Sequence, residues 1–176
     1  MKSCNLIIKK ISQVKGFLTE AHLKQLVASH VFSHIDYCNS LYYGISSNLI
    51  AKLQRVQNSA ARLVSKNKIS NDSLDDVFLD LHWLRVKFRS IYKILSIVHN
   101  CLHKNAPTET IAMLQYAYSG RTMNLRETRC LNKYGVRAFS HVGPKLWNLL
   151  PMHIREESDT DEFKKALKSF LMVRGE

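Results

Sequence analysis

The chain has 176 residues, 45% of them hydrophobic and 23% charged, so it is long enough to bury a core and too apolar for wholesale disorder. Its formal net charge of +12 indicates attraction to polyanions such as nucleic acid or anionic lipid. No stretch of membrane-spanning length stays apolar, and the apolar run at residues 6–8 is too short for the core of a signal peptide. We therefore expect an intracellular protein, nuclear or cytoplasmic, that is neither secreted nor embedded in a membrane.

Glycine and proline are scarce, and they divide the chain into amphipathic segments that are typical of a mainly α fold. The first predicted helix runs from Lys2 to Lys15. Thr19 is expected to cap a second helix, whose apolar stripe continues to Cys38. Ser46 or Ser47 is expected to cap a third helix, and its apolar stripe has helical spacing: Leu49, Leu53, Val56, Ala60 and Leu63.

A polar stripe adjoins the apolar stripe of the third helix. Its members recur at steps of three and four residues and therefore share one face: Lys52, Arg55, Ser59, Arg62 and Lys66. Gln54, Gln57 and Asn58 add amide groups that can reach phosphate, sugar or base edges. Such a face can follow a phosphate backbone, although spacing alone equally allows a solvated helix face.

The next segments continue the helical pattern. Ser73 is expected to cap a short acidic helix that ends near Leu81, and Asp75 and Asp76 suit its positive N-terminal end. A long helix then follows Trp83 and Leu84 and ends before Pro107. Thr108 restarts a shorter helix that reaches about Tyr118.

Residues 119–134 lack helical periodicity and are predicted to form a basic irregular or short-strand segment. This region is basic and contains Arg126, Arg129 and Lys133. After Pro151, Asp161 is expected to cap the last helix. The fold class is thus mainly α, a bundle of about six to eight helices, with a division between residues 1–118 and a basic loop plus C-terminal helical segment at 119–176.

No residue pattern predicts catalysis or metal binding. The pair Asp75 and Asp76 resembles part of a two-metal site, but helix capping explains it better. His30 and His34 stand four residues apart without an evident third ligand, which favours packed or hydrogen-bonded histidines at the edge of the core. The cysteines, Cys4, Cys38, Cys101 and Cys130, lack the close pairs of a zinc site and are expected to be free thiols. We expect no cofactor.

Several phrases of the sequence occur in a fixed order that is familiar from one family. They include residues 35–41 (IDYCNSL), 53–63 (LQRVQNSAARL), 81–84 (LHWL), 92–94 (YKI), 106–107 (AP), 134–139 (YGVRAF), 143–151 (GPKLWNLLP) and 163–168 (FKKALK). In these phrases the chain resembles the C-terminal end of LINE-type, non-LTR retrotransposon reverse transcriptases, downstream of the palm. It differs from them at Arg85, where the family usually has proline, and in a shorter stretch between Arg121 and Tyr134.

The resemblance implies a thumb-like helical bundle over residues 1–118, followed by the post-thumb segment. It also implies that the chain is a fragment of an RNA-directed DNA polymerase without the catalytic aspartates of the palm. On this reading the chain is not an enzyme by itself, and its partners are RNA or DNA backbones held by weak, salt-dependent contacts. The resemblance implies that Lys52, Arg55, Arg62 and Lys66 would be the main phosphate contacts. A weaker second set would be Arg126, Arg129, Lys133 and Arg137. Two alternatives stay open: a helical module that binds a protein partner through the surface that faced the palm, and a transposable-element remnant without selected function.

Overall fold

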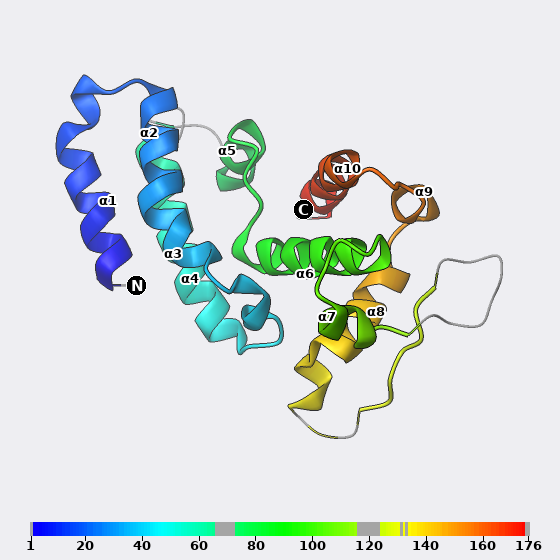
Figure 1. The fold of residues 1–176 in the computed structure, drawn as a ribbon. Helices are drawn as coiled ribbons and strands as arrows, with labels where there is room; N and C mark the ends of the chain where they lie inside the picture. Colours follow the sequence, from blue (N-terminus) through cyan, green and yellow to red (C-terminus); the bar gives the residue numbers. More distant parts are fainter. Residues whose placement is uncertain (1, 66–72, 116–123, 131, 133, 175–176) are drawn as a thin grey trace. The chain divides into compact units, whose positions relative to one another are not determined.

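A computed structural model describes residues 2–65, 73–115, 124–130, 132 and 134–174 (Figure 1). Within these ranges the chain is mainly helical and forms no β-strand. Its helices of eight residues or more are α1 (Lys2–Val14), α2 (Glu20–Val27), α4 (Ser47–Val64), α6 (Val86–Leu102), α8 (Phe139–Asn148) and α10 (Thr160–Val173). The predicted bundle of about six to eight helices is confirmed.

The chain divides into two compact units. The first runs to Ser90 and includes Arg174, and the second runs from Ile91 to Val173. The boundary falls inside α6, so one helix supplies residues to both units. These units differ from the division at 118/119 that the sequence suggested, which rests on the family resemblance and stays a prediction.

The first unit consists of helices packed around one apolar cluster. Helix α1 lies against α4, and α2 continues through a π turn (Ala28–Phe32) into the short α3 (Ser33–Asp36). The side chains of Leu23, Val27, Ala60 and Val64 are fully buried between these helices. The core therefore includes most of the apolar stripes that the sequence predicted for the second and third helices, but their end members Leu49 and Cys38 are exposed.

The π turn interrupts the long second helix without ending it. Ser29 within the turn donates its hydroxyl to the carbonyl of Gln25 at 2.9 Å and lies 3.2 Å from that of Leu26. These bonds serve carbonyl groups at the point where the regular α-helical pattern is widened. The helix therefore continues to Asp36 as one element.

The predicted helix caps are confirmed in part, with two corrections. Thr19 accepts a hydrogen bond from the amide of His22 at 3.3 Å, as predicted, whereas Ser46 precedes α4 without a side-chain cap bond. The prediction for the last helix was wrong. Asp159 rather than Asp161 caps α10, because its Oδ1 accepts from the amides of Asp161 and Glu162, each at 2.9 Å.

Two arginines tie the first unit together in the same way. Arg89 at the start of α6 binds both carboxylate oxygens of Asp36 and lies 4.5 Å from the centre of the Phe32 ring. Arg85 pairs with Asp75 of α5 (Leu74–Asp80) and lies 5.4 Å from the Phe78 ring. Each arginine thus combines a charge-assisted bond with a cation–π contact.

The second unit surrounds Trp147 and Phe163, which are fully buried. It contains the later part of α6 together with α7 (Thr108–Ala112), α8, α9 (Met152–Arg155) and α10. Helix α8 was not predicted, because Gly143 and Pro144 stand inside it. A methyl group on Gly143 would come within 3.1 Å of Val98, so glycine allows close packing there.

The segment 124–130 is irregular and runs along α8. The side-chain amide of Asn148 accepts from the amide of Leu125 and donates to its carbonyl, both at 2.9 Å. Farther along, the Thr128 hydroxyl donates to the carbonyl of Ser140, whose usual helical donor is missing because residue 144 is proline. The segment is therefore held both by Asn148 of α8 and by a backbone bond, in which the amide of Arg126 donates to the carbonyl of Gln115 at 2.7 Å.

Candidate nucleic-acid interface

The cations of α4 form the best-defined candidate surface in the described chain. Lys52, Arg55 and Arg62 are all exposed on one face of this helix, as predicted. Lys52 and Arg62 are ten residues apart, which corresponds to roughly 15 Å along the helix axis. Lys66, the fourth predicted member, lies outside the described residues.

No carboxylate of the neighbouring helices neutralises these cations. Between residues 2 and 65 the only acidic residues are Glu20 and Asp36. Glu20 pairs with Lys24 at 3.1 Å, and Asp36 pairs with Arg89. The other cations of this range make no ion pair with any described residue: Lys2, Lys9, Lys10, Lys15, Lys52, Arg55 and Arg62.

The lysines of α1 belong to this surface as well, although the sequence patterns did not single them out. Lys9 and Lys10 are exposed on α1, which packs against α4. The signal that could have identified them is the scarcity of acidic residues from the N-terminus to Val64. The positive field of the first unit therefore comes from both helices.

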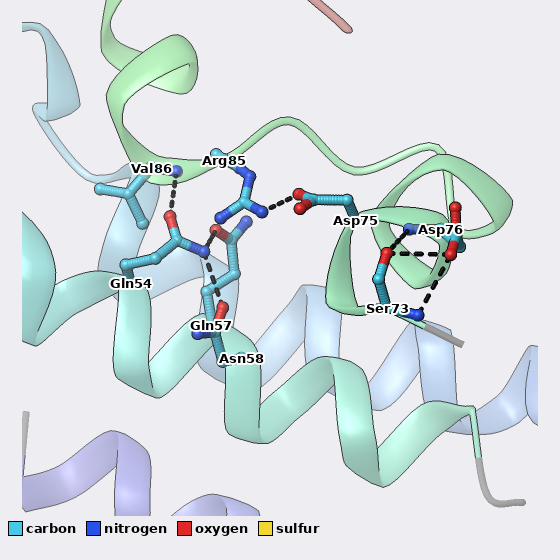
Figure 2. A network of polar contacts seen from close by, with 8 residues as sticks. All are labelled: Gln54, Gln57, Asn58, Ser73, Asp75, Asp76, Arg85 and Val86. Carbon is cyan, nitrogen blue, oxygen red and sulfur yellow. Dashed lines mark hydrogen bonds and ion pairs between the residues drawn. The ribbon is translucent and has the colours of Figure 1, made fainter. Parts of the chain in front are cut away.

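The amide side chains of α4 do not belong to the interface, which corrects the expectation from sequence (Figure 2). Gln57 is fully buried and donates its Nε2 to the carbonyl of Leu84 at 2.8 Å. Gln54 accepts from the amide of Val86 at 3.0 Å and donates to Gln57 and to Asn58. Gln54 and Gln57 thus hold the chain segment that leads into α6, and Asn58 is tied to them through its Oδ1.

The second predicted set lies in the second unit. Arg126 and Arg129 are exposed on the irregular segment beside α8, and Arg137 is exposed in a short 3-10 turn (Gly135–Arg137). Lys133 lies outside the described residues. The burial of Leu125 and its bonds to Asn148 fix the segment and direct the neighbouring Arg126 toward solvent.

The residue pairs considered for catalysis have structural partners instead. Asp76 and Ser73 form a capping box, with bonds of 3.1 and 3.3 Å between each backbone amide and the other side chain, as predicted (Figure 2). His30 contacts the Ser29 hydroxyl at 2.7 Å. Both His30 and His34 are exposed, so His30 has the hydrogen bond that was one expected alternative, and neither histidine is packed in the core.

The described part of the chain has neither a metal-binding cluster nor a membrane-spanning helix. It contains no group of three or more His, Cys, Asp or Glu side chains placed to hold a metal ion. None of its helices is both long and apolar enough to cross a membrane. The four cysteines are free thiols, as predicted, and burial raises the pKa of Cys101.

Comparison of the chain with protein-family models, with curated proteins and with solved structures found no match in any of the three.

Proposed function

We propose that the chain binds the phosphate backbone of RNA or DNA without sequence preference, through the exposed cations of α4, in the nucleus or cytoplasm. The observation that carries the proposal is the row formed by Lys52, Arg55 and Arg62, which has no carboxylate partner among the described residues. Cations without local partners release counterions from phosphates when they bind, which makes them suited to a polyanion.

The resemblance to the thumb and post-thumb region of LINE-type reverse transcriptases supports the same proposal. In such an enzyme this region would grip the template–primer duplex, while a separate palm would carry the catalytic aspartates. We therefore propose a binding role rather than catalysis for this chain, as a catalytically incomplete part of a reverse-transcriptase lineage. The second cation set, Arg126, Arg129, Lys133 and Arg137, would extend the contact.

Binding of a labelled oligonucleotide as a function of salt tests the proposal. We expect the triple variant K52A/R55A/R62A to bind more weakly than the wild type. Each lost phosphate contact removes about 0.7–0.9 from the slope of log K against log salt, so three contacts should lower the slope by about 2–3. Fluorescence anisotropy at several salt concentrations measures both quantities.

A matched control separates local contacts from total charge. Lys24, Lys164 and Lys165 each have a carboxylate partner within 3.3 Å, so the variant K24A/K164A/K165A removes the same total charge from already paired positions. For this control variant, the slope of log K against log salt should stay close to that of the wild type. Equal slopes for both triple variants, or no binding by the wild type, would count against the proposal.

A helical protein-interaction module is the second candidate. Large apolar side chains are exposed in the first unit, with Phe17 92% and Tyr37 76% accessible. Contiguous patches of exposed apolar side chains mark interaction sites, so this candidate requires Phe17 and Tyr37 to share one binding surface. Size-exclusion chromatography with light scattering would detect self-association, and its loss in the double variant F17S/Y37S would support this candidate.

A further inference from the structure

The first unit contains a cavity of about 230 Å³ between α1, the end of α3, the 3-10 turn Asn39–Tyr42 and α4. Ile35, Leu53 and Val56 form its apolar wall. The volume is below the range of about 300–1,000 Å³ that holds drug-sized ligands, so the cavity has room for a single ring system. No residue in the sequence patterns pointed to it, because its wall comes from four separate segments.

The polar side chains of the cavity are not used inside the protein. Ser3, Cys4, His34 and Tyr42 line it, and none of these side chains forms a hydrogen bond with another described residue. A hydroxyl donates and accepts, and so does a neutral imidazole through its two nitrogens. The cavity therefore offers unused donors and acceptors beside an apolar wall.

The charges around the cavity restrict the class of ligand. No Lys, Arg, Asp or Glu lines it, so the part of the ligand that enters should be uncharged. Lys2 and Lys52 are the sequence neighbours of the lining residues Ser3 and Leu53, and both are exposed. A ligand with a neutral, polar-edged ring attached to an anionic chain fits this arrangement.

We propose that the cavity receives one unpaired base of a single-stranded nucleic acid whose phosphates lie along the cations of α4. This inference rests on the proposed function and adds a preference for single strands. The base edge would meet the unused groups of Ser3 and Tyr42, and the rings of Tyr42 and His34 are of the kind on which bases stack. A base in an intact duplex cannot enter without leaving its pair.

Binding of intact and abasic strands tests the inference. The probes are labelled RNA and DNA oligonucleotides of one length, each compared with an abasic strand that carries the same number of phosphates. Because stacking of one base contributes about 1–3 kcal/mol, we expect the wild type to bind the intact strand about tenfold more tightly. Fluorescence anisotropy at one fixed salt concentration gives the ratio.

A variant that fills the cavity should abolish this ratio. Ser3 is exposed on α1, so a tryptophan in Ser3→Trp can occupy the cavity without replacing a core residue. We expect S3W to bind intact and abasic strands equally, and at the strength of the abasic strand in the wild type. Gln13→Trp places the same side chain at another exposed position of α1 and should retain the tenfold ratio. Circular dichroism checks that both variants keep their helix content.

The outcomes separate the two proposals. Equal, salt-dependent binding of intact and abasic strands by the wild type would overturn the base site and leave backbone binding in place. A tenfold ratio that persists in S3W would also overturn it, because the base would then be recognised elsewhere. Absence of binding to any strand would overturn both.

Discussion

Gln57 shows how one buried amide can define a local structure. It has no exposed surface, and its Nε2 donates to the carbonyl of Leu84 across 27 residues of sequence. In Gln57→Ala this carbonyl would lose its partner in a buried position, which costs about 1–3 kcal/mol. We expect a loss of that size in urea unfolding, whereas Gln13→Ala, at an exposed position, should change stability by less than about 0.5 kcal/mol.

His99 makes the stability of the second unit depend on pH. Its ring is fully buried, stacks on Phe163 with centroids 4.1 Å apart, and donates from Nε2 to the carbonyl of Glu157 at 2.9 Å. Nδ1 has no hydrogen-bond partner among the described residues. A proton on Nδ1 would therefore create a buried charge without an acceptor.

Burial is the main cause that lowers the pKa of His99, and the hydrogen bond to Glu157 opposes it only in part. Since the unfolded chain has a pKa near 6.5, the stabilisation is complete above about pH 6.5 and is lost as the pH falls below that value. His99→Gln keeps a donor for Glu157 but does not titrate. We expect the wild type to lose more stability than H99Q between pH 7 and pH 5 in denaturant titrations. A constant difference across this range would contradict the assignment.

At the scale of elements, the attachment of segment 124–130 to α8 depends on Asn148. Its amide binds both backbone groups of Leu125 and lies 3.1 Å from a carboxylate oxygen of Glu127. In Asn148→Ala these groups lose their partners, so the amide of Leu125 should exchange hydrogen faster by at least tenfold. Hydrogen exchange of residues 124–130 measures this. Asn58→Ala, which removes an amide from the first unit, should leave that exchange unchanged.

The sequence predicted those helices whose periodicity is local. The first four helical segments and α6 follow apolar spacing within each segment, and Ser73 caps α5 through a residue three positions away. Helix α8 could not be predicted in this way. Pro144 argues against a helix, and the compensation comes from Thr128, which a short sequence window does not include.

The same distinction holds for the candidate site. The face shared by Lys52, Arg55 and Arg62 follows from spacing on one helix, so it was predictable. The burial of Gln57 depends on Leu84, and the cavity at Ser3 and Tyr42 depends on tertiary packing. Neither follows from a local pattern.

At the scale of the whole molecule, α6 is shared between the two units, and each unit has one tryptophan. Trp83 belongs to the first unit and Trp147 to the second. Because helix formation is cooperative along α6, we expect both units to unfold together. The single-tryptophan variants Trp83→Phe and Trp147→Phe report the two units separately by fluorescence. When each fluorescence curve is compared with circular dichroism of the same variant, the midpoints should coincide, and separate midpoints would show independent units.

The charge of the molecule is less uniform than the total of +12 suggests. Lysines of α10 pair with acidic residues on the same helix, at 3.3 Å for Lys164 and 2.7 Å for Lys165. Arg85 and Arg89 are likewise paired with carboxylates. These paired cations are less available to a polyanion than the exposed cations of α1 and α4, so total charge alone would overstate the binding surface.

The π turn in the second helix determines its rotational phase. Nine residues of regular α-helix turn through about 900°, which would place Phe32 on the side opposite Leu23. The π turn at residues 28–32 contains one residue more than an α-helical turn, so the rotation from Leu23 to Phe32 is smaller. The side chains of Leu23 and Phe32 are therefore buried in one cluster. Phe32 thereby contacts Trp83, with ring centroids 4.6 Å apart, and underlies Arg89. Deletion of one residue from this turn would therefore restore a regular α-helix and leave Phe32 facing Trp83 and Arg89, whereas deletion of one residue from the regular turns before Ala28 would shift the phase by about 100° and turn Phe32 away from both.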